Sequence, residues 1–299
     1  MSDSLLIYIW NSACSVYMPF SIKNFILRIR FLLLGLLNWN AVREFVNARD
    51  NECFHKELIK QNDKLGILVW PYIHNEWGFE KKSQIIREHY HCVNDIPKLC
   101  IQSEERFEVL DLDKVKSGLK VIIDRGQWFK REGELVLNIF LAEDRIYSLA
   151  FSLGQIKGLR VAYIGGIQGV SLANVMDIYK QITKALYGMR PKDFLLNVLK
   201  AICSQIEVSE IVAISNENRH HNHSYFSNYD HNDALADYDK MWIEQGFNKS
   251  TNGFYSTSVE IGRRPLDEIA SKKRSMYRKR YALLDDITNN ISTKLTAIK

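Results

Sequence analysis

The stretch Gly133-Glu-Leu-Val-Leu-Asn-Ile-Phe-Leu141, with the residues that follow it to Gly188, decides the fold. On a β-strand, one face would carry only apolar side chains and the other would carry one polar residue: the first face is Leu135, Leu137, Ile139 and Leu141, and the second is Val136, Asn138 and Phe140. Residues 142–145 then fit a short hairpin connection, and Ile146–Leu153 alternates in the same way. The stretch therefore begins with two antiparallel strands.

A cluster of glycines joins the third strand of this stretch to a helix. Leu159–Ile164 predicts the strand, and from Ser171 to Gly188 apolar side chains recur at intervals of three and four, which predicts an amphipathic helix. A strand that ends in glycines before a helix leaves backbone N–H groups free to bind phosphate. We therefore expect a cofactor site at four residues of this loop, Gly165, Gly166, Gln168 and Gly169. The alternative is that the glycines only form a tight bend.

The following residues continue the alternation of helices and strands. Pro191 suits the first turn of a second helix, and Ile211–Ser215 predicts a short buried strand. A helix around Asp237–Gln245 then leads to a last strand at Gly253–Ile261. This order resembles the GNAT acyltransferase superfamily over roughly residues 120–261. The resemblance implies an α+β fold with a mainly antiparallel central sheet and flanking helices, and a glycine loop that holds the pyrophosphate of acyl coenzyme A.

The first hundred residues have a different character. Segments such as Ala41–Asp50 and Lys81–Val93 have helical apolar spacing, whereas Leu119–Ile123 fits an edge strand that enters the sheet. We expect a helical N-terminal region over 1–100 and a GNAT-like α/β domain with a basic C-terminal helix over 101–299. No linker rich in Ser, Gly or Pro marks the boundary, so one continuous domain stays open.

Composition and cysteine spacing indicate a protein of the reducing cytoplasm. The chain has 299 residues and a net charge of +5, and its five cysteines are scattered. The apolar run Phe31–Leu37 is far shorter than the roughly 20 residues that a membrane span needs. Because Lys23, Arg28 and Arg30 precede it, this helix fits peripheral contact with the inner membrane, or packing on its own domain.

Three residues are candidates for acid–base catalysis. Glu132 and Glu134 flank the entry to the first core strand, and Glu134 suits a general base if it faces a cleft. His220 and His221 lie in a polar loop after the strand Ile211–Ser215, a common position for a catalytic group. The alternatives are a solvated glutamate and inert surface histidines. No further ligands at suitable spacing accompany the histidines, so no metal site is predicted.

The segment Leu266–Ile291 predicts a helix with an uncommon basic run. Its candidate phosphate-binding or lipid-binding residues are Lys273, Arg274, Arg278 and Arg280. Such a helix attracts phosphate on a lipid head group or an acidic carrier protein. Nucleic acid is not expected as a partner, because no helix-turn-helix, zinc-finger or RNP pattern accompanies the run. The alternative is a solvated basic face.

Seven motifs in order carry a closer resemblance. They resemble the VirK/YbjX family of enterobacterial proteins at Glu132–Asn138, Tyr147–Leu153, Ile164–Gly169, Gly188–Lys192, Asp237–Trp242, Gly253–Tyr255 and Lys273–Tyr281. The resemblance implies a Gram-negative bacterial protein linked to virulence and to the cell envelope. It implies roles in resistance to cationic antimicrobial peptides and in expression or surface localisation of an outer-membrane autotransporter. It carries over no catalytic residues.

Two functional hypotheses follow from these patterns. The first is an acyltransferase that modifies the envelope, with acyl coenzyme A or an acyl carrier protein as donor and the basic helix binding an acidic carrier or lipid. The second is a non-enzymatic accessory factor that binds the inner membrane, an envelope or virulence client protein, or a messenger.

Overall fold

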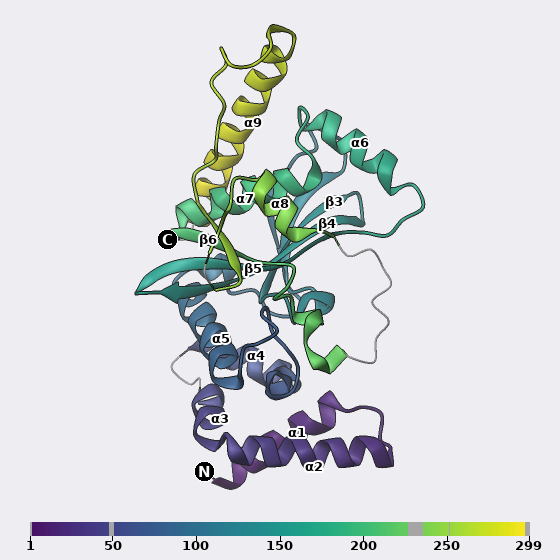
Figure 1. The fold of residues 1–299 in the computed structure, drawn as a ribbon, viewed down its shortest axis with the longest axis vertical. Helices are drawn as coiled ribbons and strands as arrows, with labels where there is room; N and C mark the ends of the chain where they lie inside the picture. The colour runs from purple at the N-terminus through teal and green to yellow at the C-terminus, as the bar shows by residue number, and fades with distance from the viewer. Residues whose placement is uncertain (1, 48–50, 227–235, 251, 297–299) are drawn as a thin grey trace.

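A mixed eight-stranded sheet forms the centre of the computed structural model, which describes residues 2–47, 51–226, 236–250 and 252–296 (Figure 1). The strand order is β1-β2-β3-β4-β5-β6-β8-β7. The strands are β1 (Arg106–Asp111), β2 (Leu119–Asp124), β3 (Leu135–Leu141), β4 (Asp144–Ile156), β5 (Leu159–Gly169), β6 (Glu210–Ile214), β7 (Asn248–Lys249) and β8 (Phe254–Ser258). All neighbouring strands are antiparallel except β5 and β6, which are parallel. The predicted α+β class is confirmed, and the sheet is mixed.

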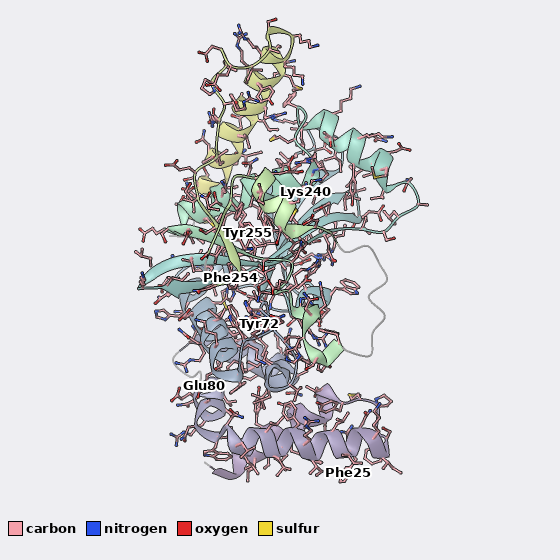
Figure 2. All side chains as sticks on the ribbon, viewed as in Figure 1. Phe25, Tyr72, Glu80, Lys240, Phe254 and Tyr255 are labelled. Atoms are coloured by element: carbon pink, nitrogen blue, oxygen red, sulfur yellow. A yellow bond between two sulfur atoms is a disulfide. The ribbon has the colours of Figure 1, made fainter. Side chains whose placement is uncertain are left out.

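Helices cover both faces of this sheet. They are α1 (Ser2–Val16), α2 (Ile22–Leu37), α3 (Trp39–Val46), α4 (Glu52–Lys60), α5 (Phe79–Asn94), α6 (Val175–Ala185), α7 (Pro191–Gln205), α8 (Tyr238–Glu244) and α9 (Ser271–Thr296). Helices α5 and α7 lie on opposite faces, and α1 and α2 form the end of the molecule farthest from the start of α9 (Figure 1). Figure 2 shows Tyr72 between the N-terminal helices and the sheet, with Phe254 in the sheet and Phe25 at the far end.

One hydrophobic core runs across the boundary predicted near residue 100. It includes Ile9 of α1 and Phe45 of α3, the inward side chains of β2 to β6, and Ile291 of α9. Strand β3 is buried along almost its whole length because helices pack on both faces of the sheet. The N-terminal helices are therefore part of the packing that holds the central strands.

Two features of the sheet differ from the sequence-based expectation. Strand β2 is not at the edge, because β1 pairs with it on its outer side. The residues of β1 mix charged and apolar types without clear alternation, and a register shift between Glu108 and Leu110 interrupts the pairing. The sequence of β1 therefore does not show the alternation by which a strand is normally predicted.

The predicted glycine loop is part of strand β5. Gly166, Gln168 and Gly169 pair in register with residues of the long strand β4, and Gly165 is taken up as a bulge. Because β4 is thirteen residues long, it supplies ladder partners well beyond Ile164. The helix α6 starts only at Val175. The prediction that these four residues form a loop with free N–H groups between strand and helix is therefore wrong.

Cys53 and Cys100 form a disulfide, which differs from the reducing environment expected from the scattered cysteine spacing. Their Cα atoms are 5.8 Å apart, and the bond ties α4 to the segment before β1. Cys92 and Cys203 are free and buried.

Within the described residues, no single helix has the length and apolar character that crossing a membrane requires. Helices α2 and α3 together meet the criterion by length and composition, but the chain bends by 91° between them.

Candidate functional site

Two buried glutamates flank Gly133 at the start of β3, and their surroundings are opposite. Glu134 is 2% exposed and lies against the N-terminal helices, whereas Glu132 is 7% exposed and lies against β5 and the loop after β6. Gly133 is required between them, because a Cβ atom there would lie 2.6 Å from the backbone nitrogen of Phe151. The chain thus passes close to β4 at this point.

Glu134 is saturated with donors. Its carboxylate accepts hydrogen bonds from Lys64 Nζ at 2.5 Å, from Arg125 Nη2 at 2.7 Å, and from the hydroxyls of Tyr72 and Tyr90 at 3.0 Å each. Burial alone would raise the pKa of this carboxyl, but the charges of Lys64 and Arg125 outweigh burial and hold the pKa of Glu134 well below its usual range. A carboxylate stabilised in this way is a weak proton acceptor, and it faces an ion-pair network instead of a cleft.

Glu132 lacks such partners. Among the described residues its Oε2 atom has no hydrogen-bond partner, and its Oε1 atom lies 3.8 Å from Nδ1 of His220, which also lacks one. Burial raises the pKa of Glu132 to about 8, and the nearby charge of Arg219 offsets only part of this effect. Burial likewise lowers the pKa of His220 to about 2. The two side chains are thus buried polar groups without the contacts that burial normally requires.

The two predicted histidines lie together at this position. Nε2 of His220 is 3.3 Å from Nδ1 of His221, and His220 is buried whereas His221 is half-buried. Glu132, His220 and His221 each offer one donor atom, and these atoms all lie within 4.8 Å of one another. We call these three residues the Glu132 cluster.

The loop that carries the histidines is held by side-chain contacts to the start of α8. Asn216 accepts a hydrogen bond from the backbone N–H of Tyr238 at 2.8 Å and donates one to Asp237 at 2.8 Å. The backbone of Arg219 pairs with His74, which fixes the residue just before His220. The histidines are therefore positioned by the start of α8 and by the segment around His74.

The glycines of β5 make room for Glu132. A Cβ atom on Gly165 would lie 2.1 Å from the backbone oxygen of Glu132, and one on Gly166 would lie 2.3 Å from Glu132 Oε2. Gly169 instead leaves space for the Tyr179 side chain of α6, because a Cβ atom on Gly169 would lie 1.8 Å from the hydroxyl of Tyr179. Gln168 is exposed. Two of the four predicted cofactor residues thus border the Glu132 cluster.

The Glu132 cluster lies where strands β5 and β6 part. These strands pair only as far as Ile164 and Ala213. Beyond that point the hydroxyl of Tyr238 takes the place of a strand partner for Ile167. It accepts a hydrogen bond of 2.8 Å from the backbone N–H of Ile167 and donates one of 2.9 Å to the carbonyl oxygen of Ile167. Arg219 stacks over the ring of Tyr238 at 3.9 Å.

The sequence pattern did not single out Glu132, Arg219 or Tyr238 as site residues. Glu132 and Tyr238 carried a signal, since they lie in the first and the fifth of the seven motifs.

The four basic residues predicted on the C-terminal helix do not form one free surface. Arg280 donates two hydrogen bonds to the carbonyl of Tyr187, at 3.0 and 2.8 Å, and Arg274 donates to the carbonyl of Ile269 at 2.9 Å. Lys273 and Arg278 are exposed. The first turns of α9 extend away from the sheet (Figure 1), so these two side chains remain available to a partner.

Comparison with known proteins links the chain to a family without a described activity. It is 26% identical to the uncharacterised protein YbjX of Escherichia coli (strain K12) over 281 residues, which cover 89% of this chain and 82% of that protein. It is also 36% identical over 149 residues to an uncharacterised protein of Haemophilus influenzae, which cover 50% of this chain and 48% of that protein. No solved structure matches. The model of the family described as "Protein of unknown function (DUF535)" matches residues 21–293, and the chain therefore belongs to this family, the VirK/YbjX family.

Proposed function

We propose that the protein is an acyltransferase that transfers an acyl group from acyl coenzyme A or an acyl carrier protein to an acceptor of the bacterial envelope. The observation that carries the proposal is the parting of the parallel strands β5 and β6 beside a buried polar cluster. Ligands of open sheets commonly bind at the carboxyl ends of parallel strands, where neighbouring strands diverge. The Glu132 cluster lies at such a point.

The element order gives the proposal its reaction class. Antiparallel strands up to β5 lead through α6 and α7 to β6, and α8 then leads to β7 and β8, with β8 placed between β6 and β7. Apart from the glycine loop, the helices and strands along the chain follow the order in which the sequence resembles the GNAT superfamily. Acyl transfer from a thioester needs a positioned acceptor and one group that removes its proton. In this proposal the Glu132 cluster positions the acceptor and removes its proton, and Glu134 has a structural role.

Binding of a donor tests the proposal. We expect saturable binding of acetyl or long-chain acyl coenzyme A, or of an acylated carrier protein, in thermal-shift and calorimetric titrations. Gly166→Val should abolish it, because the new side chain collides with the carboxylate of Glu132. Gly262→Val is the matched control, since nothing lies within 4 Å of its Cβ position. Absence of binding with all three donors would contradict the proposal.

A second function, peripheral membrane attachment, is favoured by the exposed apolar surface of α1 and α2. Most exposed large apolar side chains of the described residues lie in these two helices and the turn between them, among them Phe20 of the turn at 71%, and Ile22 and Leu37 of α2 at 82% exposure each. Residues 4–43 contain no Asp or Glu, and Lys23 and Arg30 are exposed beside the apolar side chains. An apolar surface with basic residues and no acidic ones fits an anionic lipid surface. In this proposal the protein rests on the cytoplasmic face of the inner membrane.

Vesicle sedimentation tests this attachment. We expect the protein to sediment with vesicles of phosphatidylethanolamine and phosphatidylglycerol, and less with vesicles of phosphatidylcholine alone. The double variant Ile22→Glu/Leu37→Glu should reduce the bound fraction by about tenfold or more, because charges then face the acyl chains. Trp128→Glu, at a side chain that is 81% exposed but outside these helices, should bind like the unaltered protein. Equal sedimentation of all three proteins would argue against the attachment.

A further inference from the structure

Glu132 is a buried acid that no cation of the described residues contacts by a hydrogen bond, and the charge of Arg219 acts on it only from a distance. Its side chain is 9% exposed, and among the described residues the only ion-pair contact within 4 Å is the one to His220. Its Oε2 atom has no hydrogen-bond partner among the residues that the structure describes. Burying an ionised carboxylate without a partner costs several kcal/mol or more, so such groups are normally paired or coordinate metals. Glu134, two residues away, shows what full pairing looks like.

The distances between the donor atoms of the Glu132 cluster fit a metal ion bound between them. The 3.8 Å between Glu132 Oε1 and His220 Nδ1 is too long for a hydrogen bond. Two ligands that each lie 2.0–2.1 Å from a tetrahedral zinc ion are separated by roughly 3.4 Å. With all three donor atoms within 4.8 Å of one another, small side-chain movements bring them to that separation.

We propose that Glu132, His220 and His221 form a binding site for a divalent transition-metal ion, with zinc as the first choice. Two imidazoles and one carboxylate form a ligand set that zinc and other first-row metals accept. Three protein ligands leave a further coordination position for water or a substrate atom. This site does not depend on the proposed acyl transfer, because it rests on the donor set alone.

Metal binding has a structural requirement in the histidine pair. Each neutral imidazole carries one proton, so both rings cannot ligate a metal and also keep the hydrogen bond between them. Metal binding therefore replaces this hydrogen bond. His221, as the half-buried member of the pair, has more room to adjust than His220. The backbone pairing of Arg219 with His74 meanwhile holds the residue next to His220.

The glycines of β5 provide the space in which the proposed ligand Glu132 lies. Gly166 leaves the volume that the carboxylate of Glu132 occupies beside His220, and any larger side chain there would displace that carboxylate. His220 also packs against the ring of Phe226, with ring centroids 5.8 Å apart. Small and aromatic residues therefore border Glu132 and His220 on these sides, and the positive charges of Arg219 and Arg131 lie near the same side chains.

Metal titration of the purified chain tests the site. After treatment with a chelator and dialysis, the protein is titrated with Zn²⁺ by calorimetry and with Co²⁺ by visible absorption. We expect one ion per chain, intense Co²⁺ bands typical of tetrahedral coordination, and a rise in the melting temperature with Zn²⁺. Glu132→Gln and His220→Gln should each weaken binding by about 100-fold or more, since loss of a ligand exceeds the effect of losing an outer contact.

His223→Gln is the matched control, because this residue lies in the same loop but outside the Glu132 cluster. It should bind Zn²⁺ like the unaltered chain. Circular dichroism confirms that the variants are folded, and Glu132→Gln keeps the size of the side chain in case His220→Gln does not fold. The proposal is overturned if no ion binds at one per chain, or if Glu132→Gln and His223→Gln bind equally well. Donor binding measured without metal reports separately on acyl transfer.

Discussion

Replacing Glu134 with glutamine is expected to lower the free energy of unfolding by about 3–5 kcal/mol, because the change leaves Lys64 and Arg125 buried without their main counter-charge. Arg125 keeps a contact with Glu57 at 3.3 Å, so Lys64 bears most of the loss. Since domains are typically stable by only about 5–15 kcal/mol, this is a large share of the total. Chemical denaturation followed by circular dichroism measures the change.

The same substitution has a characteristic pH dependence. The pKa of Glu134 is held below its usual range, so its contribution is complete above the unfolded value of about 4.3 and is lost as the pH falls toward the folded value. The difference in stability between the unaltered protein and Glu134→Gln should therefore be constant near neutral pH and shrink below about pH 4. Glu52→Gln, which removes an exposed pair with Lys56, should change stability far less than Glu134→Gln at neutral pH. A loss for Glu134→Gln no greater than that for Glu52→Gln would refute the structural role.

Gly165→Ala is expected to destabilise the protein strongly, by about 3 kcal/mol or more, because the added methyl group meets a backbone atom that cannot move alone. Its Cβ would lie 2.1 Å from the carbonyl oxygen of Glu132, so β5 or the start of β3 must shift. Neither can shift freely, since both strands pair with β4. Thermal unfolding provides the measurement.

Gly166→Ala and Gly262→Ala give the comparison for this prediction. At Gly166 the collision is with the side chain of Glu132, which can rotate, so we expect a smaller loss of stability than at Gly165. At Gly262 nothing lies within 4 Å of the Cβ position, and we expect no loss. If the three variants melted at the same temperature, the close approach of β5 to Glu132 would be incorrect.

Much of the fold follows from short-range patterns, and the exceptions have physical causes. Strands β3 and β6 are nearly continuous apolar runs, and β4 and α7 have the apolar period of a strand and a helix, in agreement with their burial. The glycines after Ile164 indicate a loop by composition, yet β4 supplies ladder partners along them, and this depends on a strand pairing that no local pattern encodes. The edge strand β1 was missed because its side chains are only partly buried.

The site was predicted in part for a similar reason. His220 and His221 could be proposed because imidazoles in a loop after a strand are few and chemically distinctive. Glu132 and Glu134 cannot be told apart in the sequence, since both are glutamates beside the same glycine. Their difference comes from residues far along the chain, Lys64 for one and Gly166 for the other. Only the tertiary structure brings these partners together.

The packing of α9 against β1 sets an order of assembly for the chain. Lys294 donates a hydrogen bond of 2.9 Å to the carbonyl of Glu108, 186 residues earlier, and Ile287 and Ile291 are buried. During synthesis, β1 leaves the ribosome long before α9 exists. The edge strand β1 therefore stays without its α9 contact until the last residues are made, and an unpaired edge exposed in this way is open to pairing with another chain.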